Sequence, residues 1–105
     1  MKATHRTGLA AIIDLQDDAA YSAAYREAQP GDFEVVTQPT GQRRFWFKCP
    51  GKCGQIAPIA LRPVVDGSPQ SWEFDGDMEA PTLLPSINHV GCWHGWLTHG
   101  EFVSC

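Results

Sequence analysis

The chain has 105 residues, of which 43% are hydrophobic and 19% are charged, which is enough apolar surface for one domain with a modest core. Global intrinsic disorder is excluded, because a chain of this composition gains free energy by burying its apolar side chains. Eight lysine and arginine residues against twelve aspartate and glutamate residues leave a net charge of −4, so double-stranded nucleic acid is an unlikely partner.

The start of the chain carries no targeting signal that we can recognise. The longest apolar run there, residues 9–13, is followed by Asp14 and is too short for a signal peptide or a membrane span. We therefore expect a cytoplasmic protein without membrane contact. Because cytoplasmic thiols are kept reduced, the four cysteines are expected to hold a metal ion rather than to form disulfides.

Residues 1–34 differ in amino-acid composition from the rest of the chain. They are rich in alanine, the strongest helix former, and Asp17 and Asp18 would suit the positive end of a helix dipole. Residues 29–32 include a proline and a glycine, which are typical of the end of a helix. This pattern predicts one helix at about residues 16–29.

From Phe33 onward, short β segments alternate with proline and glycine turns. The predicted strands are 33–37, 43–48, 55–61, 72–74, 82–87, 92–97 and 101–105, with the last hairpin turning at His99 and Gly100. We therefore expect an α+β fold in a single domain, 1–105. Its helical N-terminal segment would be 1–34, and a small antiparallel, zinc-binding β core would cover 35–105.

The cysteines form two groups whose spacing favours a metal site. Cys49 and Cys53 flank a proline–glycine turn, close to the spacing of structural zinc sites. In the last hairpin, Cys92, His94 and Cys105 would point to one side, since strand side chains alternate between faces. The first interpretation is a zinc-ribbon-like site with Zn²⁺ held by the four cysteines.

Two alternatives to the four-cysteine site stay open. His94 could replace Cys92 or Cys105 in a three-cysteine, one-histidine site, or the thiols could be reduced and hold no metal. Zn²⁺ is the default ion for soft thiolates in tetrahedral geometry, although iron accepts the same ligands. His89 and His99 are expected to be surface turn residues.

Several motifs between Phe45 and Cys105 resemble those of a known family. They are Cys-Pro-Gly-Lys-Cys (49–53), Trp-Glu-Phe-Asp-Gly-Asp (72–77), Ala-Pro-Thr-Leu-Leu-Pro-Ser-Ile (80–87), and Cys92-x-His94 followed by Gly100 and Cys105. On these residues the chain resembles a small phage and prophage zinc-binding family that is often mislabelled as ammonia monooxygenase. The first third of the chain has no counterpart in that resemblance.

The resemblance also implies a possible activity. Relatives of the family occur in bacterial ubiquitin-like conjugation operons, where they are regarded as peptidases that process the modifier. Carried over to this sequence, the resemblance implies Ser86 as the nucleophile and His94 as its general base.

Read from the residues alone, Ser86 and His94 lie on either side of a turn and could meet across two adjacent strands. The alternative is that Ser86 caps a turn and His94 packs beside the metal as a hydrogen-bond donor. An orienting carboxylate could come from Asp75, Asp77 or Glu79, and nothing in the sequence ranks them.

Three functions are compatible with these patterns, and the sequence leaves enzymatic activity open. The first is a prophage-type binding or adaptor module with a structural zinc ion and an unknown protein or peptide partner. The alternative is a peptidase or esterase that uses Ser86 and His94 on the zinc-stabilised scaffold. A redox role for Cys49 and Cys53 is the weakest, because their spacing is not that of a thioredoxin-like motif.

Overall fold

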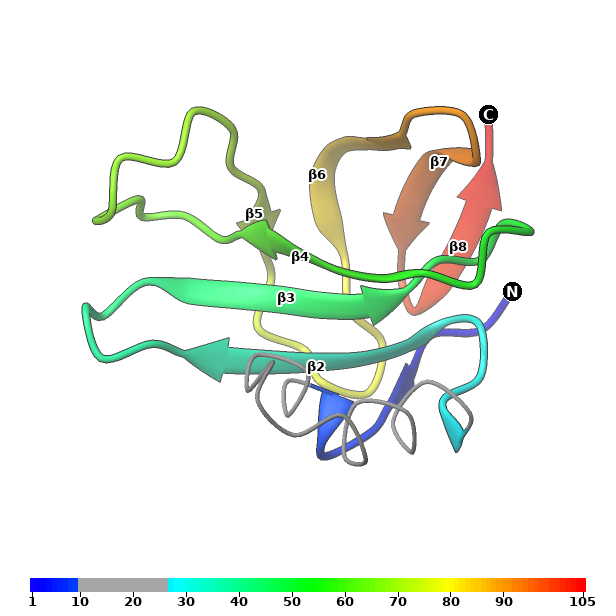
Figure 1. Cartoon of the computed structure of the whole chain (residues 1–105), viewed down its shortest axis with the longest axis horizontal. Coiled ribbons are helices and arrows are strands. Elements are labelled where there is room, and N and C mark those ends of the chain that lie inside the picture. Colours follow the sequence, from blue (N-terminus) through cyan, green and yellow to red (C-terminus); the bar gives the residue numbers. More distant parts are fainter. Residues whose placement is uncertain (10–26) are drawn as a thin grey trace.

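The computed structural model of the chain describes residues 1–9 and 27–105. The described residues form two four-stranded sheets, ordered β1-β2-β3-β4 and β5-β6-β7-β8 (Figure 1). The strands are β1 (Thr4–His5), β2 (Asp32–Thr37), β3 (Arg43–Lys48), β4 (Ile56–Ala60), β5 (Glu73–Phe74), β6 (Leu83–His89), β7 (Trp93–Thr98) and β8 (Glu101–Ser104).

The first sheet is built around the antiparallel meander β2-β3-β4. Phe33 of β2 pairs with Phe47 of β3, and Phe45 of β3 pairs with Ile59 of β4. Phe33, Phe45 and Phe47 are buried, because side chains two positions apart share a face of a strand. The strands predicted at 33–37, 43–48 and 55–61 are therefore confirmed within one or two residues.

The second sheet ends in the predicted hairpin at His99 and Gly100, where Thr98 pairs with Glu101. Both turn residues have positive φ, which suits a two-residue hairpin turn. Earlier in the sheet the pairing of β6 with β7 is irregular. From Leu83 to Ile87, β6 advances by four residues while β7 advances by two, so β6 carries a bulge between these two residues.

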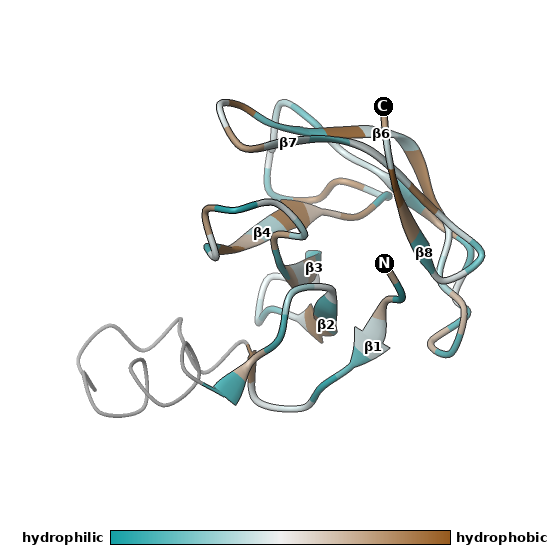
Figure 2. Cartoon of the chain, turned by 90° about the vertical axis from the view of Figure 1, so that its right-hand side faces the viewer, coloured by the Kyte–Doolittle hydropathy of each residue, from teal (hydrophilic) through white to brown (hydrophobic). Residues whose placement is uncertain are grey.

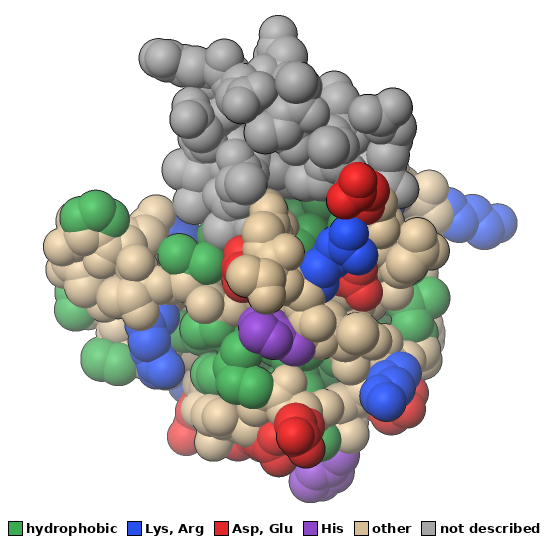
Figure 3. Space-filling view, turned by 90° about the horizontal axis from the view of Figure 1, so that it is seen from below, with side chains coloured by type: hydrophobic (Ala, Val, Ile, Leu, Met, Phe, Trp, Pro, Cys, Tyr) green, Lys and Arg blue, Asp and Glu red, His purple; other side chains and the backbone are tan. Residues whose placement is uncertain are grey.

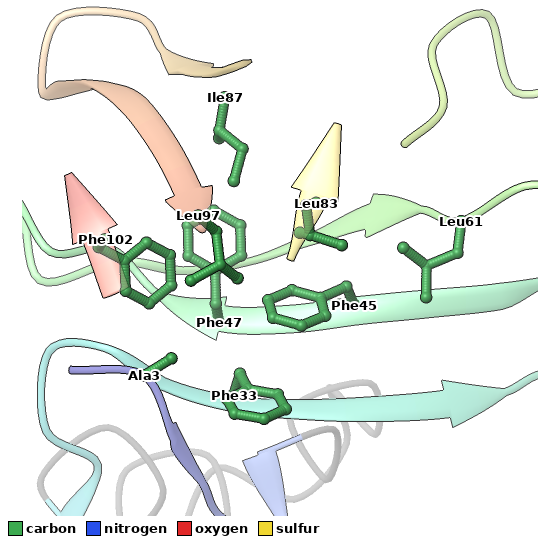
Figure 4. Close-up of a cluster of buried hydrophobic side chains, with 9 residues drawn as sticks. All are labelled: Ala3, Phe33, Phe45, Phe47, Leu61, Leu83, Ile87, Leu97 and Phe102. Atoms are coloured by element: carbon green, nitrogen blue, oxygen red, sulfur yellow. The ribbon is translucent and has the colours of Figure 1, made fainter. Parts of the chain in front are cut away.

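The two sheets enclose one main hydrophobic core. Figure 2 shows the molecule from the side, with β2, β3 and β4 below β6 and β7. Both sheets contribute buried side chains, which point toward one another in Figure 4. These are Ala3, Phe33, Phe45, Phe47, Leu61, Leu83, Ile87, Leu97 and Phe102. Removing one of the buried phenyl rings would cost about 3–5 kcal/mol, as large-to-small substitutions in cores do.

The predicted α+β class is wrong for the part of the chain that the structure describes. The helix expected at about 16–29 falls mostly on residues 10–26, which lie outside the described residues. The segment expected to be helical instead supplies β1, which pairs in parallel with β2, and the start of β2 itself. Its backbone also bonds to the other sheet, since Ala3 N–H donates to the carbonyl of Gly100 at 2.7 Å. The described ends of this segment therefore join the two sheets.

The surface shows no large region of one charge in the view from below. Basic and acidic side chains of the described residues are interspersed there (Figure 3). Arg44, for example, makes an ion pair with Asp66, and Arg6 lies near Glu27 and Asp32. Among the described residues, no helix has the length and apolarity needed to cross a bilayer.

Candidate active site and candidate metal centre

Ser86 and His94 form a hydrogen-bonded pair on the second sheet. Ser86 lies on β6 and His94 on β7, and the Oγ and Nε2 atoms are 3.4 Å apart. Asn88 pairs directly with His94, so Ser86 is the diagonal neighbour of His94 on the same face. The intervening Ile87 points into the core and is buried. The alternation of the strands thus presents a hydroxyl and an imidazole together on the outer face.

A cleft lies beside Ser86. It has a volume of about 470 Å³ and is bounded by β6 and by the loop that precedes β5. The indole Nε1–H of Trp72 donates to the carbonyl of Ser86 at 3.2 Å, which ties this loop to the strand. The cleft residues are Arg62, Pro69, Gln70, Ser71, Trp72, Pro85, Ser86, Asn88 and Val90. Ser86 is therefore one of the residues that line this cleft.

Two of the three carboxylates considered as orienting groups, Asp75 and Asp77, have structural partners of their own. Asp75 Oδ1 accepts backbone N–H bonds from Asp77 and Thr82. Asp77 Oδ1 accepts bonds from the backbones of Glu79 and Ala80, and these bonds lower the pKa of the Asp77 carboxyl. The two aspartates therefore order the loop between β5 and β6, and the site rests on the Ser86–His94 pair.

A second cluster brings together Cys49, Cys53, His89 and Cys92. One ligand atom from each residue lies within 4.8 Å of the others. The sulfurs of Cys49 and Cys92 are 3.4 Å apart, and Cys53 Sγ lies 3.7 Å from Nδ1 of His89. The first two cysteines come from the loop between β3 and β4, and the other two residues come from the end of β6 and the turn before β7.

Backbone geometry fixes the β3–β4 loop close to the β6–β7 turn. Cys49 N–H donates to the carbonyl of Gln55 at 2.8 Å, which closes the loop. Gly51 N–H points to Cys49 Sγ at 3.4 Å, and Cys53 N–H points to Cys92 Sγ at 3.2 Å. Gly51 is required for this approach, because a Cβ there would lie 2.6 Å from Cys92 Sγ.

The surroundings of the sulfurs shift the pKa values of Cys49 and Cys92 in opposite directions. Burial raises the pKa of the Cys49 thiol to about 12, with further contributions from the neighbouring sulfurs. Hydrogen bonds from the side chain and backbone of Cys53 lower the pKa of Cys92, because they stabilise its thiolate. The side chains of the cluster thus contact one another in pairs, Cys49 with Cys92 and Cys53 with His89.

The donor set fits a tetrahedral metal ion. With zinc–sulfur bonds of about 2.3 Å, two sulfurs on one tetrahedral ion lie about 3.8 Å apart. The separations in the cluster, 3.4 Å between Cys49 and Cys92 and at most 4.8 Å overall, are near that value. Three thiols and one imidazole are ligands that zinc commonly accepts. The cluster could therefore hold a metal ion.

The structure places two of the candidate ligands elsewhere. Cys105 and His94 lie outside the cluster, facing each other across β7 and β8, where Cys105 N–H donates to the carbonyl of His94 at 2.9 Å. The argument from alternation does not extend to Cys92. This residue precedes β7 and lies in the turn, so it does not share the outer face with His94.

Sequence reasoning missed His89 as a candidate ligand. The available signal was its position three residues before Cys92, a spacing close to that of Cys49 and Cys53. A tight turn brings the pair together, with Cys92 N–H donating to the carbonyl of His89 at 2.9 Å. His99, by contrast, is an exposed turn residue, as predicted.

Ser86 and His94 thus lie in hydrogen-bond contact on a two-sheet β scaffold, and a histidine beside a serine is a contact that serine hydrolases use. The chain belongs to the BubE family, the serine proteases of the bacterial ubiquitination-like system, whose family model matches residues 20–105. No match was found among the curated proteins or among the solved structures.

Proposed function

We propose that this protein is a serine protease that cleaves a peptide or isopeptide bond in a protein substrate of a bacterial ubiquitination-like system. The observation that carries the proposal is the 3.4 Å contact between Ser86 Oγ and His94 Nε2 beside an open cleft. Family membership supports the same activity and the substrate class. The enzyme is proposed to act in the cytoplasm on a modifier protein.

In the proposed reaction, Ser86 Oγ attacks the carbonyl carbon of the scissile amide while His94 Nε2 accepts the hydroxyl proton. Collapse of the tetrahedral intermediate breaks the C–N bond, and the imidazolium returns its proton to the leaving amine. An ester then joins Ser86 to the acyl part of the substrate. Water hydrolyses this ester with His94 as the base, which releases a carboxylic acid and regenerates the serine.

We also propose that Cys49, Cys53, His89 and Cys92 bind a structural Zn²⁺ ion. Four protein ligands leave no open position for a water molecule, which favours a structural role over a hydrolytic one. His89 lies three residues after Ser86, and Cys92 lies two residues before His94. Cross-linking the end of β6 to the start of β7 would therefore hold the serine and the histidine in register.

The activity is tested by labelling the purified protein with a fluorophosphonate probe and locating the modified residue by mass spectrometry. We expect modification of Ser86 in the wild-type protein and its loss in Ser86→Ala. Ser104→Ala is the matched control, because Ser104 accepts a hydrogen bond from Trp93 and lies on β8. If Ser86 stays unmodified while the protein is folded, the protease proposal fails and a binding or adaptor role takes its place.

A further inference from the structure

Among the described residues, the edge of β6 that faces the cleft has no paired strand over most of its length. The neighbouring strand β5 has two residues and pairs only with Leu83 and Leu84. Among the described residues, no strand pairs with the part of β6 from Pro85 to His89 on that side. Figure 1 shows β6 continuing well beyond the end of β5. The second half of β6 is thus an edge strand next to Ser86.

The backbone of Asn88 points toward this open edge. In an antiparallel sheet the N–H and C=O of one residue point to the same side of the strand. The carbonyl of His94 accepts from Cys105 N–H, so the backbone of His94 points toward β8 and away from β6. Asn88, which pairs with His94, must therefore direct its own N–H and C=O away from β7.

The contact of Trp72 confirms this orientation. Residues 86 and 88 direct their backbones to the same side, since they are two positions apart. The carbonyl of Ser86 on that side accepts the Trp72 indole N–H at 3.2 Å. Trp72 therefore closes the edge at Ser86, whereas Asn88 presents a donor and an acceptor beyond it.

The cleft runs along the same edge. Pro85, Ser86, Asn88 and Val90 line one side, and Val90 is 83% exposed. The other side comes from the loop before β5, which includes Arg62, the one charged side chain among the described residues that line the cleft. The cleft therefore combines an apolar rim, one positive charge and a free backbone edge.

We propose that the substrate binds in this cleft as an extended peptide segment that adds a strand to the edge of β6 and pairs with the backbone of Asn88. Strand addition obtains affinity from main-chain hydrogen bonds and selectivity from pockets for alternate side chains. The positive charge of Arg62 favours a segment with a neutral or acidic side chain at that position. This inference rests on the proposed function, since the paired segment would carry the bond presented to Ser86.

The test compares Asn88→Pro with Asn88→Ala, both made in the Ser86→Ala background so that nothing is cleaved. Proline removes the N–H on the open edge and leaves the bonds to β7 intact, because prolines are tolerated on strand edges. Alanine removes the side chain and keeps the N–H. The probe is a pool of N-acetylated, C-amidated hexapeptides, titrated into ¹⁵N-labelled protein and followed by amide chemical shifts and hydrogen exchange.

We expect the pool to shift the Asn88 amide and the Trp72 indole signals and to slow exchange at Asn88. Asn88→Pro should weaken binding at least about fivefold more than Asn88→Ala, as the loss of a main-chain hydrogen bond does. If Asn88→Pro does not fold, a pool with N-methylated backbones replaces it, and this pool should not bind to the Ser86→Ala protein.

Three results would overturn the inference: equal binding by the two variants, binding of the N-methylated pool, or shifts confined to another surface. The fluorophosphonate reaction separates this failure from failure of the protease proposal. Labelling of Ser86 without peptide binding at Asn88 would refute strand addition to β6 and leave the protease proposal standing. Peptide pairing with no labelling would refute the protease and leave a peptide-binding edge.

Discussion

Cys53 and His89 are 36 positions apart in the chain, yet Cys53 Sγ lies 3.7 Å from Nδ1 of His89. This contact joins the β3–β4 loop of one sheet to the end of β6 in the other. His89 shares strand β6 with Ser86, so a residue of the proposed metal site lies on the strand that carries the proposed nucleophile. The contact therefore couples the proposed metal site to the strand that carries Ser86.

The ligand set predicts different effects of His89 and Cys105 on metal binding. His89→Ala should weaken zinc binding by more than about 100-fold, because it removes a direct ligand. Removing a residue that only hydrogen-bonds to a ligand costs about 10- to 100-fold. Cys105→Ser should bind zinc as the wild type does, since Cys105 lies outside the cluster. Competition with a chromophoric chelator measures both affinities. The reverse order of the two variants would favour the four-cysteine site.

His94→Ala should slow fluorophosphonate modification of Ser86 by about 100-fold or more, the usual contribution of a general base. The control is His99→Asn. His99 is exposed in the last hairpin turn with φ of 48°, a conformation that asparagine tolerates. Stopped-time labelling followed by mass spectrometry gives the rates. Equal rates for the two variants would show that His94 does not activate the serine.

Gly51→Ala should destabilise the protein by about 1–3 kcal/mol, as overpacking does, because the added Cβ would lie 2.6 Å from Cys92 Sγ. It should also weaken zinc binding, since the loop must move away from the turn. Urea denaturation with zinc present measures the free energy of unfolding. Lys52→Ala, an exposed change in the same loop, should leave the free energy of unfolding nearly unchanged. If Lys52→Ala lowered it as much as Gly51→Ala does, the loss would not be due to the added Cβ at Gly51.

Asp77→Asn should reduce stability at neutral pH and have no effect in acid. Backbone N–H bonds hold the pKa of the Asp77 carboxyl below its ordinary value of 3.8. Since the folded-state pKa is depressed, the stabilisation is present above pH 3.8 and is lost as the pH falls through the folded value. Thermal unfolding of both proteins between pH 2 and 7 should show Tm curves that converge in acid. Parallel curves would contradict this account.

Much of the β architecture could be predicted from local patterns. The alternation around Phe45 and the turn at His99 and Gly100 identify β3 and the last hairpin, because period-two burial and turn residues are local signals. The parallel pairing of β1 with β2 could not be predicted in this way. It is a two-residue strand whose partners are far along the chain, and no periodicity marks it.

The candidate site was predictable where it depends on strands and not where it depends on turns. Ser86 and His94 meet across adjacent strands, which a register argument can anticipate. Cys92 and His89 meet in a turn, where alternation no longer determines the direction of a side chain. The cytoplasmic location, the prophage origin and the single-domain organisation stay predictions.

The irregular pairing of β6 with β7 has a consequence for how this chain can vary in length. The excess on β6 between Leu83 and Ile87 is an even number of residues, so both side chains still enter the interior. Losing or gaining a single residue just before Ser86 would turn the side chains on one side of that position to the opposite face of the sheet. Either the hydroxyl of Ser86 would be buried and Ile87 exposed, or Leu83 would be exposed. Tolerated insertions and deletions there should come in pairs.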